Sequence, residues 1–330
     1  MYILKDQPED FIVEENISPS IFSQEPTHYH VYLLTKKNYT TERAVRQVAF
    51  SLKKPRNKFS YAGTKDKKAI TKQHIVIQGV SKEQVEKLVL EDISLEFKGY
   101  AKNHLRLGDL ESNRFHIVIR NAPGPIQEKE TFEVPNYFDD QRFSTQNVTI
   151  GMHLLKKEFD KITALLIEHD DDFSEKISAH LEKLPNDHIG AIRLLPRKTM
   201  LFFVHAVQSL LFNELLKKEI TPTYTSSYSQ GELYFADEYT FTHQLPLLGF
   251  EHDEHPILEE YGLSSRNFLI TSMPELSLSG SMRNAFFTVK NFLAEEINEV
   301  TKKVSFDLPK GCYATIVIRQ LAARNGFDQQ

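Results

Sequence analysis

The 330-residue sequence has few of the features that mark secreted or membrane-spanning proteins. It contains one cysteine, Cys312, and so no intrachain disulfide, which is typical of proteins in a reducing compartment. No stretch offers the roughly 18 consecutive apolar residues that a membrane-spanning helix needs. The N-terminus turns acidic at Asp6 and shows no signal peptide. These absences predict a soluble, cytoplasmic protein.

Sequence motifs for bound metals and nucleotides are also absent. Neither GxxxxGK[ST] nor GxGxxG occurs, so no nucleotide cofactor is indicated. His28 and His30 would share one face of a strand, and His252 and His255 flank two acidic residues, but neither pair has a third ligand at a suitable spacing. The sequence therefore predicts no metal and no cofactor.

Charge is distributed unevenly along the chain, whose net charge is −5. Of 40 basic and 45 acidic residues, 20 and 15 lie in residues 1–120, which leaves 20 basic and 30 acidic residues beyond. Residues 36–72 hold 12 basic residues against only Glu42 and Asp66, with several aromatic residues between them. Positive charge interleaved with aromatic rings is typical of a nucleic-acid surface. The alternative is a solvated helix face over residues 40–53.

The arrangement of apolar segments predicts a mixed α/β chain of two domains, as its length also favours. Short strands with hairpin-length links favour antiparallel pairing. An apolar helix over 200–213 indicates a buried helix in a middle segment, 146–287, and β character returns after it. The predicted strands cover residues 11–13, 30–34, 61–62, 74–77, 93–97, 115–120 and 303–309, and the predicted helices cover 41–52, 81–90, 200–213 and 313–323.

The stretch from Tyr61 to Gln73 is the strongest functional signal. It places one carboxylate, Asp66, among four lysines on a glycine-led loop between two predicted strands. Nearby positive charge favours the ionised form of a carboxylate. Such a group suits a nucleophile or base that acts on a phosphate-bearing substrate, although an ordinary solvated strand connection has the same composition.

Several motifs in order along nearly the whole chain resemble the TruD-type tRNA pseudouridine synthases. The signature at 135–144 is the most specific of them. Two departures from the family pattern lie there, because Asp139 and Ser144 stand where glycine is usual, and a third is Gln320, where an acidic residue commonly follows the arginine. The matching segments are Lys5 with Pro8–Glu15, Gly63–Gln73, Asn113–Phe115, Pro135–Ser144, Ala206–Asn213, Leu245–Gly249 and Gly311–Thr315 with Arg319.

The resemblance implies an α+β fold with a mostly antiparallel sheet and flanking helices. It assigns a catalytic domain to residues 1–145 and 288–330 and an inserted α/β domain to 146–287, on the far side of an RNA-binding cleft. Because the insertion is acidic, we expect the RNA to lie mainly against the 36–72 surface. The family's usual bacterial target is uridine 13 of tRNA, and we expect a monomer without an obligatory protein partner.

The resemblance also implies roles for individual residues. Asp66 is the catalytic carboxylate, acting as nucleophile or base near C1′ or C2′ of the target uridine. The expected substrate-binding residues are Phe115, stacked on the uracil, with Asn113, Tyr313, Lys5 and Arg319. Phe115 opens an apolar strand, so a core role is the alternative. The expected contacts to the RNA backbone are Lys65, Lys67, Lys68, Lys72, Lys53, Lys54 and Arg56.

Two other classes of function compete with this interpretation. One is a non-catalytic RNA-binding or RNA-folding protein on the same scaffold. The other is a nuclease or phosphotransferase, which would need a divalent metal and a second clustered carboxylate. The sequence lacks such a cluster, so the synthase is favoured.

Overall fold

The computed structural model describes residues 2–144, 146–168, 172–239 and 243–328. By its internal contacts the chain divides into two compact units, residues 1–134 with 287–330, and residues 135–286. The expected domain boundary after residue 145 falls on a residue outside the described ranges. The functions expected of the two parts stay predictions.

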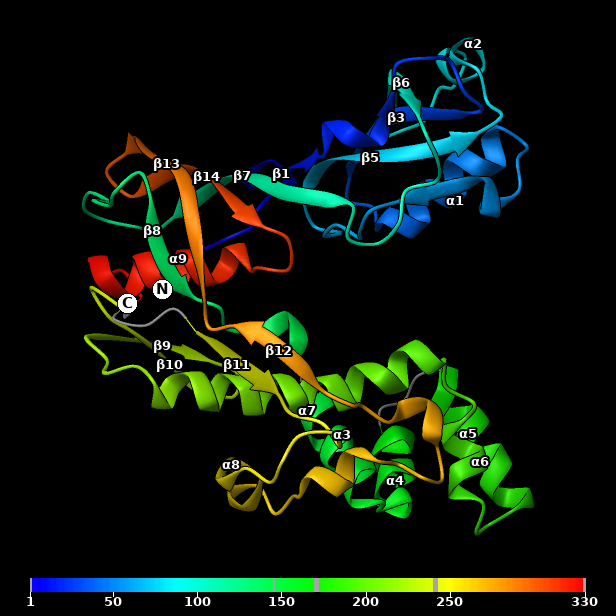
Figure 1. Cartoon of the computed structure of the whole chain (residues 1–330), viewed down its shortest axis with the longest axis vertical. Helices are drawn as coiled ribbons and strands as arrows, with labels where there is room; N and C mark the ends of the chain where they lie inside the picture. Colours follow the sequence, from blue (N-terminus) through cyan, green and yellow to red (C-terminus); the bar gives the residue numbers. More distant parts are fainter. Residues whose placement is uncertain (1, 145, 169–171, 240–242, 329–330) are drawn as a thin grey trace. The chain divides into compact units, whose positions relative to one another are not determined.

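The first unit is built on a ten-stranded sheet, shown in Figure 1. The strand order is β2-β6-β3-β5-β1-β7-β14-β13-β8, and β4 also pairs with β5. The strands are β1 (Phe11–Ile17), β2 (Phe22–Ser23), β3 (Tyr29–Lys37), β4 (Phe59–Tyr61), β5 (Ile70–Gln78), β6 (Ile93–Ala101), β7 (Leu110–Arg120), β8 (Phe132–Pro135), β13 (Phe286–Asn298) and β14 (Thr301–Pro309).

Pairing in this sheet is mostly antiparallel, which confirms the predicted fold class. Strand β7 runs antiparallel to both β1 and β14, and β3 runs antiparallel to both β5 and β6. The pair β1–β5 is parallel, with Ile12 opposite Ile70. The hairpin-length links did not indicate this parallel contact, and it decides where Lys5 and Asp66 meet.

Helices α1 (Thr41–Ser51), α2 (Lys82–Glu86) and α9 (Ala314–Asn325) complete the unit. Figure 1 shows α9 beside the part of the sheet formed by β8, β13 and β14. The hydroxyl of Thr40 caps α1 by accepting the N–H of Arg43 at 3.2 Å. Helix α2 is shorter than the predicted 81–90, because the chain leaves the helix at Lys87 and Leu88 and Leu90 pack against the core instead.

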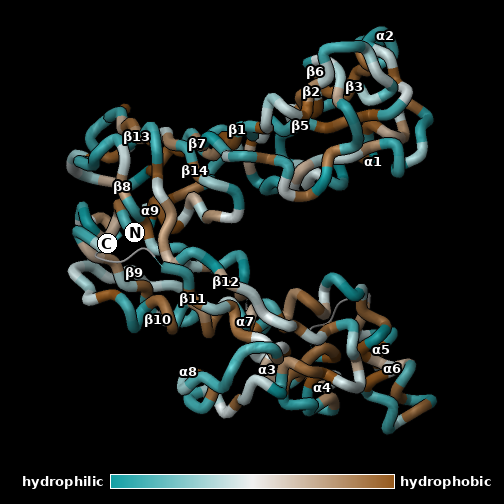
Figure 2. Tube along the Cα trace, viewed as in Figure 1, coloured by the Kyte–Doolittle hydropathy of each residue, from teal (hydrophilic) through white to brown (hydrophobic). Residues whose placement is uncertain are grey.

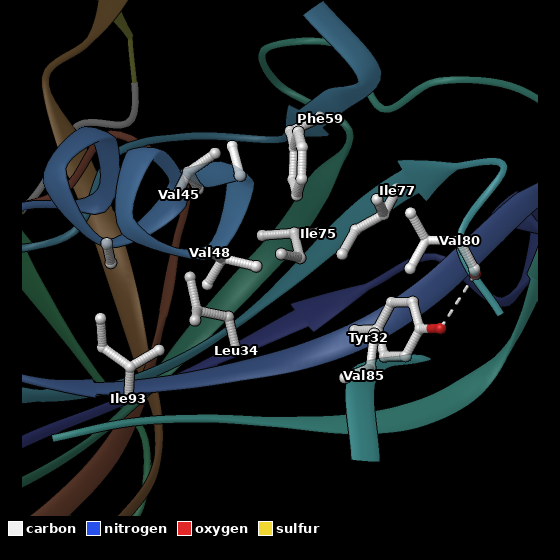
Figure 3. Close-up of a cluster of buried hydrophobic side chains, with 12 residues drawn as sticks. Tyr32, Leu34, Val45, Val48, Phe59, Ile75, Ile77, Val80, Val85 and Ile93 are labelled. Atoms are coloured by element: carbon white, nitrogen blue, oxygen red, sulfur yellow. Dashed lines mark hydrogen bonds between the residues drawn. The ribbon is translucent and has the colours of Figure 1, made fainter. Parts of the chain in front are cut away.

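A core cluster joins α1 to the sheet, as Figure 3 shows. Val45 and Val48 of α1 lie against Leu34 of β3 and Ile75 of β5, all fully buried. Burial of each such side chain contributes about 1.5–3 kcal/mol. The helix is therefore held on β5, the strand that follows the Asp66 loop, and on its neighbour β3.

The second unit is mainly helical, with two short antiparallel sheets of two strands each, β9–β10 and β11–β12. In Figure 2 its helices carry hydrophobic stretches between hydrophilic ones. The elements are α3 (Asn147–Lys156), α4 (Phe159–Glu168), α5 (Asp172–Lys183), α6 (His188–Ile192), α7 (Arg197–Lys218), β9 (Tyr224–Tyr228), β10 (Gly231–Phe235), β11 (Gln244–Leu247), α8 (Pro256–Glu260) and β12 (Ser281–Asn284).

Helix α7 contains the predicted apolar helix and extends it at both ends. It is long and apolar enough to cross a membrane by composition, but 72% of that stretch is buried inside the protein. The side chain of Asn213 accepts the N–H of Phe138 at 2.9 Å and donates to its carbonyl at 2.8 Å. Helix α7 is therefore the central core helix of the unit and also holds the signature segment.

The two glycine departures in that signature behave differently. Ser144 has φ +35°, so a serine occupies the left-handed region that glycine adopts without strain. Asp139 has φ −104°, an ordinary value, and its carboxylate accepts the N–H of Asp140 at 2.8 Å. Of these two positions, only Ser144 carries backbone strain.

Candidate active site

Asp66 and Lys5 meet because their strands run in parallel. Lys5 precedes β1 and Asp66 precedes β5, so both segments reach the same end of this strand pair. The Lys5 Nζ lies 2.5 Å from Asp66 Oδ2, with side chains 15% and 35% exposed. Lys5 Nζ also lies 4.0 Å above the ring of Phe11. The predicted carboxylate is thus partly open to solvent and paired with one ammonium group.

Buried polar side chains hold the loop that carries Asp66. The Thr41 hydroxyl accepts the N–H of Lys65 at 2.9 Å and lies 2.7 Å from Gln73 Oε1. Gln73 Nε2 donates to the carbonyl of Gly63 at 3.0 Å. Thr41 and Gln73 are fully buried. The loop is therefore fixed from below by α1 and β5 at two points of its backbone.

A buried ion pair lies beside the same loop. Lys65 Nζ donates to Glu15 Oε1 at 2.8 Å, and the backbone N–H of His74 donates to Glu15 Oε2 at 2.8 Å. Burial raises the pKa of Glu15, but hydrogen bonds from His74 and Lys65 and the Lys65 charge outweigh it, so the pKa lies below its ordinary value. The Lys65 side chain is only 7% exposed. We therefore drop the expectation that Lys65 contacts the RNA backbone.

Lys36, on β3, lies beneath the loop and is fully buried. Its Nζ donates to the carbonyl of Asp66 at 2.7 Å and to that of Tyr39 at 2.6 Å. In the sequence, Lys36 is only one member of the basic segment 36–72. Alternation along β3 could have indicated its burial, because Tyr32 and Leu34 lie on the same face of that strand.

Phe115 and Asn113 lie on β7, one strand beyond β1. Phe115 pairs with Val13 in register and is 8% exposed. Its ring stacks on Phe306 at 5.7 Å and meets Phe11 edge-on at 6.0 Å. Phe115 therefore packs in the core, as the alternative interpretation predicted. Its stacking on a uracil stays a prediction.

Asn113 lies opposite Glu15 in the β1–β7 register, which places it next to the Lys65–Glu15 pair. Its Oδ1 is buried and accepts no hydrogen bond from any residue that the structure describes. A buried amide oxygen without a donor is available to a ligand or to water. Asn113 therefore keeps its predicted binding role as a proposal.

Tyr313 and Arg319 belong to the closing helix of the same unit. Tyr313 immediately precedes α9 and Arg319 lies within it. Gln320, the third departure, is buried and its Nε2 donates to the carbonyl of Glu133 at 3.2 Å. An ionised carboxylate has no donor, so glutamine makes a link to β8 that an acidic residue would not.

The other basic residues expected at the RNA backbone fall into two sets. Arg56 pairs with Glu42 at 2.7 Å and Lys72 pairs with Glu14 at 2.7 Å. Hydrogen bonds from Arg56 and Arg46 lower the pKa of Glu42 to about 2 against the opposing effect of burial. Within the described ranges, no hydrogen bond or ion pair engages the side chains of Lys53, Lys54, Lys67 and Lys68.

A second basic segment, which was not predicted, lies between β6 and β7. Lys102, His104 and Arg106 line a polar pocket of about 300 Å³. The N–H of Gly108 donates to the carbonyl of Ala62 at 2.9 Å, which joins this segment to the start of the Asp66 loop. A three-residue spread of positive charge is a weak sequence signal, and only the fold places it near the loop.

The histidines considered as metal ligands have other surroundings. The ring of His30 meets Phe97 and Tyr100 edge-on, at 6.0 and 5.1 Å. The side chain of His255 accepts the N–H of Ile257 at the start of α8. Among the described residues, no group of three or more His, Cys, Asp or Glu side chains could hold a metal ion.

Known proteins of one family are similar to this chain along nearly its full length. The family model for tRNA pseudouridine synthase D (TruD) matches residues 2–179, 171–248 and 249–321. The probable tRNA pseudouridine synthase D of Methanopyrus kandleri is 32% identical, over 90% of this chain and 86% of its own. The tRNA pseudouridine synthase D of Aquifex aeolicus is 27% identical, over 96% and 97% of the two chains.

A solved structure gives the same result for the fold. The crystal structure of the putative tRNA pseudouridine synthase D from Methanosarcina mazei superposes with a TM-score of 0.70 and 25% identity. It covers 96% of this chain and 92% of its own.

Proposed function

The chain belongs to the TruD family of tRNA pseudouridine synthases, isomerases that act on tRNA, and we propose that Asp66 is its catalytic carboxylate. One observation carries this proposal. Asp66 is a partly exposed carboxylate on a loop anchored to buried side chains, with the Lys5 ammonium 2.5 Å away. The charge-assisted hydrogen bond from this ammonium orients the carboxylate, as a nucleophile or base requires.

The reaction needs the uridine to leave its stack, because C1′ and the base edge are otherwise inaccessible. Asp66 then either attacks C1′ as the C1′–N1 bond breaks, or removes the proton from C2′. The freed uracil turns and its C5 bonds to C1′, which breaks the Asp66–C1′ bond in the first route, while in the second route the proton returns to C2′. C5 then loses its proton and N1, freed from the sugar, gains one. Substrate and product have the same atoms, so no oxidant, reductant or co-substrate enters the balance.

The remaining residues are proposed to bind the target nucleoside. The buried Oδ1 of Asn113, which has no donor among the described residues, would accept a hydrogen bond from the uracil N3–H. Phe115 would stack on the uracil beside Phe306, on which its ring already packs. Tyr313 and Arg319 would approach from the start and the body of α9, Arg319 toward a phosphate.

Four lysines of the 36–72 segment are proposed to bind the tRNA backbone. These are the side chains without a protein partner in the described part of the chain, Lys53, Lys54, Lys67 and Lys68, to which the structure adds Lys102 and Arg106 beside the pocket. Lys72 and Arg56 already pair with Glu14 and Glu42, so an RNA phosphate would have to share each of these cations with its carboxylate. A footprint on residues 53–72 and 102–106 would support this surface, and a footprint confined to 146–287 would contradict it.

We further propose that the target is uridine 13 and that the enzyme acts in the cytoplasm as a monomer without an obligatory protein partner. The test is site mapping of pseudouridine in unmodified tRNA transcripts, in EDTA, with the wild type beside Asp66→Asn. Modification at position 13 by the wild type and none by the variant is the expected result. RNA binding without pseudouridine in either protein would instead indicate a non-catalytic scaffold, and activity that EDTA abolishes would indicate a metal-dependent enzyme.

A further inference from the structure

The buried ammonium group of Lys36 is an unusual feature of the first unit. Its side chain is fully enclosed, and its Nζ donates to two backbone carbonyls, those of Asp66 and Tyr39. Burial disfavours the charged form of a lysine. The fold nevertheless places this group directly beneath the residue proposed as the catalytic carboxylate.

Two charged side chains act on Lys36, and both belong to the Asp66 loop. Burial lowers the pKa of Lys36 to about 8, the Asp66 carboxylate opposes that shift, and Lys65 adds to it. Lys5 acts indirectly, through its pairing with Asp66. No carboxylate among the described residues forms an ion pair with Lys36, so its charge is balanced by the carbonyls and by Asp66 at a distance.

We propose that protonated Lys36 is a positioning residue that fixes the backbone of Asp66 and so aims its carboxylate at the substrate. This inference rests on the proposed function. Lys5 holds the carboxylate from one side, whereas Lys36 holds the main chain of the same residue from beneath. An atom displaced by about 1 Å at a reacting centre can reduce the rate on the order of 100-fold.

The chain offers a matched control in Lys302, on β14. This lysine is also buried, at 2% exposure, and its Nζ donates to the carbonyls of Asn298 and Glu299 at 3.2 and 3.3 Å. It also pairs with Glu296 at 2.9 Å. Lys302 therefore anchors a turn in the same way, but the turn between β13 and β14 carries no proposed catalytic residue.

The test compares Lys36→Met with Lys302→Met in the full-length protein. The measurements are the single-turnover rate of pseudouridine formation at saturating tRNA transcript, the Kd for tRNA and the melting temperature. We expect Lys36→Met to lose rate by roughly 10- to 100-fold while Kd changes less than about twofold, since the lysine faces the interior. Lys302→Met should keep the wild-type rate even if its melting temperature falls.

The pH profile separates positioning from a purely structural role. The wild-type rate should decline above pH 8 as Lys36 loses its proton. Unfolding does not explain such a decline: between pH 8 and the ordinary value of 10.5, the unfolded chain binds the proton and the folded chain does not, so this group adds stability as pH rises. Lys36→Arg stays protonated throughout this range and should abolish the part of the decline that belongs to Lys36.

The possible outcomes are distinct. A wild-type rate in Lys36→Met, or an equal loss of rate in Lys302→Met, would overturn the proposal. If Lys36→Met does not fold, the arginine variant decides, and a decline above pH 8 identical to that of the wild type would count against it. Absence of pseudouridine in the wild type, by contrast, would refute the proposed function itself.

Discussion

Two groups of lysines lie in the same basic segment, residues 36–72, but have opposite surroundings. The inner lysines, Lys36 and Lys65, are enclosed and donate to Asp66, Tyr39 and Glu15. The outer lysines, Lys53, Lys54, Lys67 and Lys68, have no protein partner among the described residues.

This difference separates two tasks within one basic segment. A buried, bonded ammonium can position a backbone atom but cannot reach a phosphate. An exposed, unpaired ammonium can bind phosphate and contributes little to the fold. Loss of an inner lysine should therefore affect the rate or the stability, and loss of an outer lysine should affect RNA binding.

The largest expected effect concerns the residue that the inner lysines surround. Asp66→Asn keeps the size of the side chain but removes the charge that is proposed to act on the sugar. We expect the single-turnover rate to fall on the order of 10²–10⁴-fold, with the Kd for tRNA unchanged within about twofold. Filter binding and site mapping on the same preparation measure both. Undiminished activity would remove Asp66 from the mechanism.

The second prediction compares a buried ion pair with a partly exposed one, whose glutamates are adjacent on β1. Lys65→Met leaves Glu15 buried without its partner and should destabilise the fold by about 3–5 kcal/mol. Lys72→Met breaks the pair with Glu14, whose side chains are 41% and 35% exposed, and should change stability by less than about 1 kcal/mol. Urea unfolding measures both, and equal losses would show that the inner and outer surroundings do not differ energetically.

The third prediction concerns the outer lysines alone. The double variant Lys67→Ala with Lys68→Ala should weaken tRNA binding by roughly threefold to tenfold, as two exposed ion pairs of up to about 1 kcal/mol each allow. The salt dependence of log K should become shallower by about 0.7–0.9 for each phosphate that the variant no longer neutralises. The rate at saturating RNA should stay at the wild-type value. A slower rate at unchanged affinity would place these lysines in the inner group.

The smallest expected effect is on stability and concerns two positions in the second unit. Variants there should change the free energy of unfolding but not the binding of tRNA. Ser144→Gly relieves a left-handed serine and should stabilise the protein by about 1 kcal/mol. Asp139→Gly removes the acceptor for the Asp140 N–H at an ordinary φ and should destabilise it. Thermal unfolding gives the two signs, and both variants should retain the wild-type Kd for tRNA.

Much of the fold was predictable from local patterns. The predicted strands at 74–77 and 115–120 lie within β5 and β7, and the predicted helix at 200–213 lies within α7. These elements depend on apolar periodicity and turn residues, which the sequence contains. The parallel pairing of β1 with β5 joins segments about 60 residues apart and has no local signal.

The candidate site was predictable in part for the same reason. A carboxylate among lysines indicated Asp66, and the family motifs indicated Lys5, Asn113 and Phe115. The partners of each cation were not indicated, because Lys65 and Lys67 lie two residues apart with opposite surroundings. Lys36, Thr41 and Gln73 are separated in sequence and become one support for the loop only when β3, α1 and β5 pack together.

The sequence by itself determined the family, the α+β class, the basic segment and the identity of the candidate carboxylate, since these follow from residue types in order along the chain. Only the tertiary structure decided which cations are enclosed and which have no protein partner among the described residues. Burial and pairing depend on contacts between distant segments, and at Asp66 those contacts come from the parallel strands that bring Lys5 to it and from the buried Lys36 beneath it.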